Sequence, residues 1–306
     1  MKRNKAPLSS LKKKENRIAL GFISVKYVGE TIFVFVPVLF SILYSFTDYN
    51  AARETEPFFS RIGDIWIWFG NYKQLFTHFM YSEYFLRSVG NNLFMLLSVP
   101  LGIIAGLLVA AILSRPAIRF SGAFRMLIYM PVVAGAVAMN IIWRYMFDNQ
   151  YGLINQIFGT QLMWLTDDWL VKTAIVIKNV WGGIGRTMIL CLAAMFAVDN
   201  NYYEAAKLDG AGEVRRFFAI TFPIITPTIF YLLITGVIAN LQMYTDSLIF
   251  ASGDPGAQTV VYFIWTFGIK RSMYGLAAAA STLLTVTIML ITIVQFRVSN
   301  RWVFEG

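Results

Sequence analysis

Cysteine, histidine and charge are all scarce in this 306-residue chain. Charged residues make up 14% of it, against roughly 25% in typical soluble domains. Cys191 is the single cysteine, which excludes a disulfide framework, a cysteine zinc cluster and iron–sulfur ligation. His78 is the single histidine, which excludes a histidine-based metal site and a Ser–His–Asp triad. We therefore expect no catalytic residue, no metal and no cofactor bound by this chain.

A nucleotide-binding phosphate loop is also missing. The pattern Gly-x4-Gly-Lys-Ser/Thr occurs nowhere in the sequence. The glycine-rich run 182–187 has a different spacing and lies within an apolar stretch, where it favours close helix packing or the lining of a cavity. We expect no ATP-hydrolysing site in this chain.

Apolar residues, in contrast, are abundant at 57% of the chain. Six stretches are long enough to cross the hydrocarbon core as helices, which takes about 20 residues. They cover about 27–46, 91–113, 126–147, 171–197, 224–245 and 276–297. The sequence therefore predicts an all-α integral membrane protein with six transmembrane helices.

The distribution of Lys and Arg predicts the orientation of these spans. The tail 1–26 has a local charge of +7, out of a net charge of +9 for the chain, and loop 114–125 has three arginines and no acid. Loop 148–170 has three aspartates and no basic residue, so we expect it outside. A basic chain can bind nucleic acid. An excess of basic residues confined to a tail beside the first span is instead typical of a cytoplasmic anchor. We therefore expect the tail to lie at a lipid surface and the chain to bind no nucleic acid.

Counting six spans then places both termini in the cytoplasm. We divide the chain into a basic cytoplasmic tail (1–26), a six-span transmembrane domain (27–297) and a cytoplasmic C-terminal tail (298–306).

The inner loop 198–223 is longer than a connection between antiparallel helices needs. Asn201 and Glu204 have the spacing of a capping box, and Gly210 is a natural helix stop. A second helical run over 213–219 is expected to end before Pro223. The loop is thus predicted to be helix, glycine turn, helix. Its exposed apolar residues favour either docking to a partner or packing under the bundle.

This loop carries a family motif. Glu204-Ala205-Ala206 is followed by Gly210 and then by Ile220-Thr221-Phe222-Pro223. The spacing resembles the hallmark of permease subunits of binding-protein-dependent ABC importers, in their carbohydrate-uptake branch. The one departure is Phe222, where the family usually has leucine. Further similar elements extend the resemblance over about 27–297.

The resemblance implies the type I ABC importer permease fold in a bacterial-type inner membrane. It also implies four kinds of partner: a second permease subunit in a heterodimer, two cytoplasmic ATPase subunits that use ATP and Mg, an extracytoplasmic solute-binding protein, and membrane lipid. The segment from Glu204 to Gly210 would be the coupling helix that docks on an ATPase. The residues implied in coupling are Glu204, Ala205, Ala206, Asp209, Gly210, Arg215 and Arg216. For Glu204 the alternative is simple helix capping, and for the two arginines a solvated face.

Polar residues within the spans are candidates for a substrate path, because they are costly to bury unpaired in lipid. Planar amides, charges and aromatic faces are groups that bind sugars. The candidates are Asn140, Lys178, Asn179, Trp181, Arg186, Asn240, Gln242 and Tyr244. Asn91, Asn92 and Asp246 are further polar residues in or near the spans that are candidates for a functional role. The alternative for each is hydrogen bonding between helices without ligand contact.

Lys178 and Arg186 are eight residues apart, which places them about 80° apart around a helix. Two cations on one path would suit an acidic oligosaccharide, such as a uronate polymer fragment. The alternatives are a snorkelling Lys178 and a salt bridge within the bundle for Arg186.

The resemblance thus implies a permease subunit of an ATP-driven importer that moves a carbohydrate into the cytoplasm by alternating access. An ion-coupled secondary transporter is the alternative, but it would normally show paired repeats with interrupted helices and an ion site in the spans. A membrane enzyme is a second alternative, and the chain lacks an acid–base or metal cluster for it.

Overall fold

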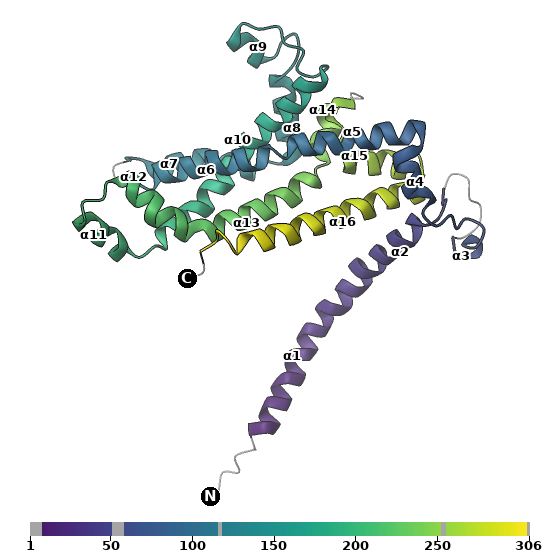
Figure 1. Cartoon of the computed structure of the whole chain (residues 1–306), viewed down its shortest axis with the longest axis horizontal. Helices are drawn as coiled ribbons and strands as arrows, with labels where there is room; N and C mark the ends of the chain where they lie inside the picture. The colour runs from purple at the N-terminus through teal and green to yellow at the C-terminus, as the bar shows by residue number, and fades with distance from the viewer. Residues whose placement is uncertain (1–7, 51–57, 116–117, 252–254, 305–306) are drawn as a thin grey trace, which may run out of the picture.

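The computed structural model describes residues 8–50, 58–115, 118–251 and 255–304 (Figure 1). All regular secondary structure in these residues is helical. Lys2, Arg3 and Lys5 of the predicted basic tail, and residues 305–306 of the predicted C-terminal tail, lie outside the described residues.

Helices follow one another along the whole described chain. In the first half they are α1 (Leu8–Glu30), the π-helical η1 (Thr31–Phe35), α2 (Val36–Ser45), α3 (Phe58–Arg61), α4 (Gly70–Thr77), α5 (Phe79–Met95), α6 (Ser98–Leu113), α7 (Ser121–Val133), α8 (Ala136–Met146) and α9 (Leu153–Phe158). In the second half they are α10 (Asp168–Phe196), α11 (Asn200–Leu208), α12 (Glu213–Arg216), the π-helical η2 (Phe217–Thr221), α13 (Phe222–Leu241), α14 (Thr245–Ala251), η3 (Pro255–Ala257), α15 (Val260–Trp265), the π-helical η4 (Thr266–Lys270) and α16 (Tyr274–Ser299).

Five helical segments are long and apolar enough to cross a membrane: Ala19–Ser45, Phe79–Leu113, Asp168–Phe196, Glu213–Leu241 and Tyr274–Ser299. A sixth crossing requires α7 and α8 together, and these two helices are bent by 99° at the break between them. The stretch predicted over 126–147 as one transmembrane helix is therefore a bent pair of helices, Ser121–Val133 and Ala136–Met146. Pro131 within α7 lacks an N–H donor, and the chain leaves the helix at Ala134 and Gly135, both of which have extended backbone.

The first and second crossings begin earlier than the apolar stretches at 27–46 and 91–113 predict. The helix of the first crossing already starts at Leu8, and the helix of the second starts at Phe79. Polar residues occupy these extensions, so the hydropathy of the sequence marks the membrane core but not the ends of the helices.

The body of the molecule is a bundle in which α6, α10, α13 and α16 run side by side (Figure 1). The α6–α10 contact is the tightest, because Gly106 lets the backbones approach and a Cβ there would overlap the Thr187 side chain. α2 packs against α16 at the edge of this body, and α1 extends away from the body. Gly185 allows a similar approach of α10 to α7, where a Cβ would lie 2.6 Å from the Ile128 carbonyl oxygen.

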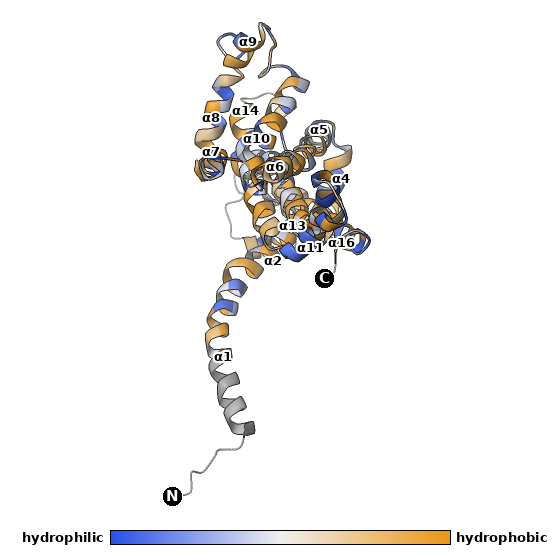
Figure 2. Cartoon of the chain, turned by 90° about the vertical axis from the view of Figure 1, so that its left-hand side faces the viewer, coloured by the Kyte–Doolittle hydropathy of each residue, from blue (hydrophilic) through white to orange (hydrophobic). Residues whose placement is uncertain are grey.

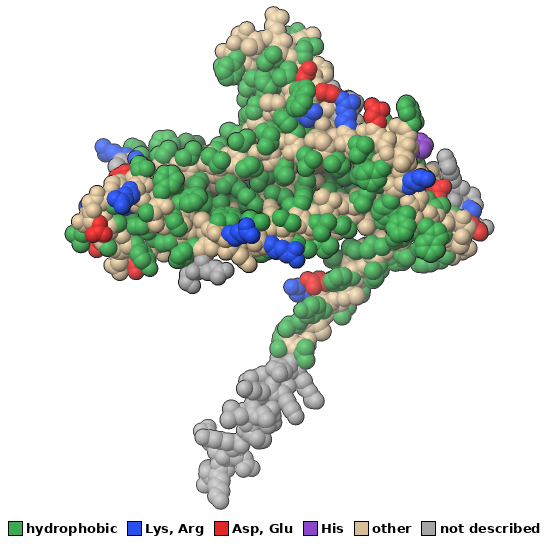
Figure 3. Space-filling view, in the orientation of Figure 1, with side chains coloured by type: hydrophobic (Ala, Val, Ile, Leu, Met, Phe, Trp, Pro, Cys, Tyr) green, Lys and Arg blue, Asp and Glu red, His purple; other side chains and the backbone are tan. Residues whose placement is uncertain are grey.

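Hydrophobic residues predominate along the long helices, and hydrophilic residues gather around α4, α9 and α11 (Figure 2). The space-filling view shows the same division, with charged side chains around the edges of the face and hydrophobic ones across much of its middle (Figure 3). A protein in water would not expose so much apolar surface, so the middle of the bundle matches the hydrocarbon core.

Candidate functional site

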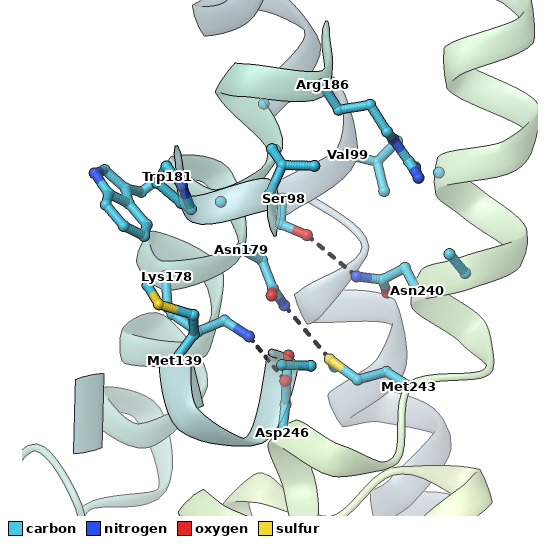
Figure 4. Close-up of a pocket in the computed structure, with 18 of the residues that line it drawn as sticks. Ser98, Val99, Met139, Lys178, Asn179, Trp181, Arg186, Asn240, Met243 and Asp246 are labelled. Atoms are coloured by element: carbon cyan, nitrogen blue, oxygen red, sulfur yellow. Dashed lines mark hydrogen bonds and ion pairs between the residues drawn. The ribbon is translucent and has the colours of Figure 1, made fainter. Parts of the chain in front are cut away.

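A cavity of about 590 Å³ lies in the bundle, walled by α6, α7, α8, α10, α13 and α14 and by the chain that joins α13 to α14. The structure brings all eight predicted substrate-path residues to its wall. They are Asn140 from α8, Lys178, Asn179, Trp181 and Arg186 from α10, and Asn240, Gln242 and Tyr244 from α13 and the segment after it. Figure 4 shows this cavity and the side chains that face it.

Local backbone features open the space. Gly182 and Gly183 on α10 line the cavity, and nothing would lie within 4 Å of a Cβ at either position. α13 ends at Leu241, and the non-helical residues before α14 turn Gln242 and Tyr244 toward the cavity. The glycine run at 182–187 therefore serves both predicted purposes, cavity lining at Gly182 and Gly183 and close packing at Gly185.

Three side chains from three helices form a closed polar cluster in the cavity wall. Lys178 Nζ lies 2.8 Å from Asp246 Oδ1 and donates a hydrogen bond of 2.7 Å to Asn140 Oδ1. Asn140 Nδ2 in turn donates to Asp246 Oδ1 at 2.6 Å. The side chains of Lys178 and Asp246 are only 12% and 10% exposed. The cluster ties α8, α10 and α14 together and neutralises the Lys178 charge.

Arg186 has no such partner. No described residue forms an ion pair or hydrogen bond with its guanidinium, and its side chain is exposed to the cavity. In Figure 4 it lies at the opposite side of the view from Lys178 and Asp246. Both cations border one cavity, as the helical spacing predicts, but the ion pair belongs to Lys178 rather than to Arg186.

Asn140 and Asn240 make the hydrogen bonds between helices that were the alternative to ligand contact. Asn240 Nδ2 donates to the Met95 carbonyl and to Ser98 Oγ, both at 3.1 Å, across the break between α5 and α6. Its Oδ1 is buried without a partner in the described residues. Asn92 Oδ1 accepts from the Val260 N–H at 2.8 Å in the same region. These amides hold the helix breaks that shape the cavity.

The remaining lining groups are less constrained. Asn179 Nδ2 contacts only the Met243 sulfur, at 3.4 Å, and no hydrogen bond of the Gln242 or Tyr244 side chain is found among the described residues. Trp181 packs edge-on against Trp143, with ring centroids 5.3 Å apart, and is 39% exposed. Amide, phenol and indole groups are therefore free to face a ligand.

Asp246 is one of the polar residues that the sequence marks as functional candidates, but its pairing with Lys178 was not predicted. It is an acidic residue just after the fifth span, in a chain whose spans hold almost no carboxylate. That rarity was a usable signal. Its partner 68 positions earlier in the sequence had no local signal.

The loop after α10 is the second candidate site. Asp199 caps α11, because its side chain accepts from the Asn201 N–H at 2.9 Å. The predicted capping box of Asn201 and Glu204 is therefore wrong, since the N-cap lies two residues earlier, at Asp199, and Asn201 lies inside the helix. Gly210 has a φ of +76°, the left-handed turn that the sequence predicts.

The second half of this loop also differs from the prediction. The helix that begins at Glu213 does not end before Pro223 but continues through η2 into α13. η2 is a π turn in which the Phe222 N–H bonds to the Phe217 carbonyl, and Pro223 follows in the first turn of α13, where a missing N–H is tolerated. The run Glu213–Leu241 thus joins the loop to the cavity without a break.

α11 protrudes at one end of the body (Figure 1). Leu208 is 90% exposed and Phe218 64%, and two described contacts fasten the loop: the Tyr203 hydroxyl to Thr221 Oγ1 at 2.8 Å, and Arg115 to Glu213 at 3.5 Å. Leu208 and Phe218 therefore do not pack under the bundle, whereas Phe217 of the same loop packs against a buried core cluster. Of the predicted coupling residues, five are exposed and two are half-buried: Glu204, Ala205, Asp209, Gly210 and Arg215 in the first group, Ala206 and Arg216 in the second.

The loop between α8 and α10 is built around Asp148. Its carboxylate accepts backbone N–H bonds from Tyr151 at 2.9 Å and Gln150 at 3.0 Å, and these bonds, the Tyr151 bond first, lower the pKa of Asp148 below its usual value. At the far end of the loop, Asp167 caps α10 by accepting from the Trp169 and Leu170 N–H groups. Asp168 pairs with Arg87 of α5. Both aspartates are structural.

A family model described as the binding-protein-dependent transport system inner membrane component matches residues 98–304. This range includes the cavity and the α11 loop. The chain belongs to this family. The permease is 30% identical to the probable ABC transporter permease protein YesP of Bacillus subtilis (strain 168) over 302 residues, which cover 95% of the permease and 93% of YesP. It is 32% identical to the lactose transport system permease protein LacF of Rhizobium radiobacter over 212 residues, covering 67% and 71% of the two chains.

A solved structure with the same fold is that of a bacterial alginate ABC transporter in complex with an alginate pentasaccharide-bound periplasmic protein. Its matching chain superposes with a TM-score of 0.80 at 21% identity, covering 96% of the permease and 97% of that chain. The type I ABC importer permease fold, the family and the inner-membrane location predicted from the sequence are thereby confirmed.

Proposed function

We propose that this permease imports an oligosaccharide into the cytoplasm by alternating access, driven by ATPase subunits that dock on the loop from Glu204 to Gly210. The observation that carries the proposal is the unbroken run Glu213–Leu241, which leads from this loop to the cavity. Its 29 residues span about 43 Å at 1.5 Å per residue. A displacement of the loop would reach Asn240, Gln242 and Tyr244 through one helix.

The docking surface is supported by its exposure. Glu204 lies in the middle of α11 and makes no capping bond, so its charge is free for a partner. Leu208 beside it is an almost fully exposed apolar side chain. Ala205 and Ala206 allow close approach, Asp209 and Gly210 form the turn, and Arg215 and Arg216 follow on the next helix. We infer that ATP and Mg act only on the ATPase subunits.

Carbohydrate as the substrate class rests on the lining and on the relatives. LacF is named for lactose, and other relatives of 25–27% identity are named for maltose/maltodextrin, arabinooligosaccharides and galactooligosaccharides. Asn179, Gln242, Tyr244 and Trp181 offer the amide, hydroxyl and indole groups that such sugars require. Asn140 and Asn240 support the wall instead of offering all their groups to a ligand.

A second permease subunit, two ATPases and an extracytoplasmic binding protein complete the proposed assembly. The first crossing supports a partner within the membrane, since it diverges from the body and its apolar side chains are almost all exposed. In this arrangement residues 1–26 and 298–306 lie in the cytoplasm. Family membership favours this ATP-driven mechanism over the ion-coupled alternative.

An acidic oligosaccharide is the second candidate substrate, and the unpaired Arg186 favours it. A guanidinium can bind a carboxylate through two parallel hydrogen bonds. The Arg186→Gln variant tests this candidate, because unchanged uptake of an acidic oligosaccharide would contradict it.

Charge reversal at Glu204 tests the coupling role. In proteoliposomes that hold the full transporter, Glu204→Lys is expected to abolish the stimulation of ATP hydrolysis by the loaded binding protein. Glu83→Lys is the matched control, because Glu83 is an exposed acid on α5 outside this loop. Stimulated ATP hydrolysis that survives Glu204→Lys, or uptake by the permease reconstituted alone, would contradict the proposal.

A further inference from the structure

The cavity is lined by three ionised side chains: Lys178, Arg186 and Asp246. Two of them are already paired with each other, so the wall carries a net charge of +1. The uncompensated charge belongs to Arg186 alone. Without Asp246 the same wall would carry +2.

The Lys178–Asp246 pair is held in place on more than one side. Asn140 bonds to both members, and Asn140 itself is only 1% exposed. Asp246 lies in the first turn of α14, and Ser247 next to it donates a 2.9 Å hydrogen bond to Thr259 Oγ1. The Thr259 hydroxyl donates to the Met243 carbonyl at 2.7 Å. The carboxylate is therefore fixed against Lys178 by the fold rather than free to swing into the cavity.

Arg186 differs in each of these respects. It is exposed to the cavity, has no described ion-pair partner, and lies two helical turns from Lys178 on α10. Gly182 and Gly183 between the two cations leave open space in front of the helix. A ligand in that space meets one free cation and one cation whose field is cancelled by a neighbouring carboxylate.

We infer that Asp246 is a specificity-determining residue of this cavity: by neutralising Lys178 it limits the preference for acidic over neutral sugars to what Arg186 alone provides. This inference rests on the proposed transport of an oligosaccharide through the cavity. Asp246 acts through Lys178 and need not touch the substrate. Sugar selectivity then follows the net charge of the wall, whichever of the three residues sets it.

Four variants vary this charge in steps. Asp246→Asn leaves the wall at +2, Arg186→Gln and Lys178→Gln each leave it at 0, and the double variant Lys178→Gln/Asp246→Asn returns it to +1. The double variant is the matched control, because it carries the same amide substitutions as its parents without their change in net charge.

The first measurement reads the charge without a substrate. A cysteine introduced by Gly183→Cys would face the cavity, where a Cβ meets nothing within 4 Å, and the native Cys191 is buried. Its reaction rates with an anionic thiosulfonate, the ethylsulfonate, and a cationic one, the ethyltrimethylammonium, give a rate ratio for each variant in the assembled transporter. We expect the anion-to-cation ratio to rise at least about fivefold in Asp246→Asn and to fall by a similar factor in Arg186→Gln, since a unit charge 4 Å away in bulk water changes an equilibrium by about that factor.

The second measurement is the ratio of uptake of trigalacturonate to uptake of galactotriose in the same proteoliposomes, relative to the unsubstituted permease. A ratio cancels differences in assembly and in the binding protein. We expect the uptake ratio to be highest in Asp246→Asn, lower and equal in the unsubstituted permease and the double variant, and lowest in Arg186→Gln and Lys178→Gln. An unchanged thiosulfonate ratio in Asp246→Asn, or a double variant that differs from the unsubstituted permease, would overturn the inference. So would a shifted thiosulfonate ratio without a shifted uptake ratio. Failure of the proposed function would look different: no uptake of either sugar by the unsubstituted permease, with the order of thiosulfonate ratios intact.

Discussion

The cavity wall and the α11 loop both place polar residues where an apolar protein has few, but they treat them in opposite ways. In the wall, Lys178, Asp246 and Asn140 bond to one another. The side chains of Lys178 and Asp246 are 12% and 10% exposed, and Asn140 is 1% exposed. In the loop, Glu204 and Asp209 are exposed and bond to no described side chain, beside an exposed Leu208.

The two regions therefore find their bonding partners in different places, one within the chain and the other on a second protein. A buried charge without a partner is costly, so the cluster of Lys178, Asp246 and Asn140 in the wall must be satisfied within this chain. An exposed charge is solvated, so leaving it unpaired costs little free energy. The exposed Glu204 and Asp209 of the loop can therefore remain without partners until a second protein docks. The wall should therefore govern stability, and the loop should govern coupling.

The largest expected effect breaks the wall. Lys178→Gln leaves Asp246 buried without its cation and should lower the free energy of unfolding by about 3–5 kcal/mol, measured as thermal unfolding of the purified permease in detergent. Adding Asp246→Asn should restore most of this loss, because no charge is then left unpaired. Glu204→Gln in the loop should change the stability by less than about 0.5 kcal/mol. A comparable loss from Lys178→Gln and Glu204→Gln would remove the distinction between the two regions.

A smaller effect is expected at the turn of the loop. Gly210→Ala forces a side chain into a left-handed backbone, at a cost of about 1–2 kcal/mol that is steric and local, since a Cβ there meets nothing within 4 Å. We expect the direction of α11 to change, and therefore the sugar transported per ATP hydrolysed to fall while the melting temperature shifts by only a few degrees. Gly212→Ala is the control, because Gly212 has a φ of −67° and open space around it. An equal fall in coupling for Gly212→Ala would show that the turn geometry at Gly210 is not what matters.

The two regions also differ in how far the sequence predicted them. The loop motif is local: Glu204 to Gly210 are seven consecutive residues whose spacing, helix propensity and glycine turn can be recognised without any other part of the chain. The cavity residues were found because amides and charges are conspicuous in apolar stretches. The pairing of Lys178 with Asp246 could not be found in this way, because the two residues meet only through the arrangement of α10 and α14.

The positions of helix breaks were also not predicted correctly from the sequence. The bend after α7 follows a proline, but Pro223 is accommodated by a preceding π turn and does not end its helix. Pro131 also lies inside its helix, which continues to Val133, so neither proline marks the residue at which a helix ends. The N-cap of α11 is Asp199 and not Asn201, because two polar residues two positions apart can both cap a helix and the backbone path from α10 decides between them.

The smallest effect is expected at Asp148, which lies in neither region and is satisfied by its own loop. Backbone N–H bonds from Tyr151 and Gln150 lower its pKa below the unfolded value of 3.8. A depressed pKa stabilises the folded loop above the unfolded pKa, and this contribution is lost as the pH falls through the folded pKa. The protection of the amides of residues 150 and 151 against exchange, relative to their intrinsic exchange rates at each pH, should therefore fall below about pH 3.8 in the unsubstituted permease, and Asp148→Asn should remove that pH step. Because the carboxylate is exposed, neither the cavity nor the α11 loop should respond, and a pH step that persists in Asp148→Asn would assign it to another group.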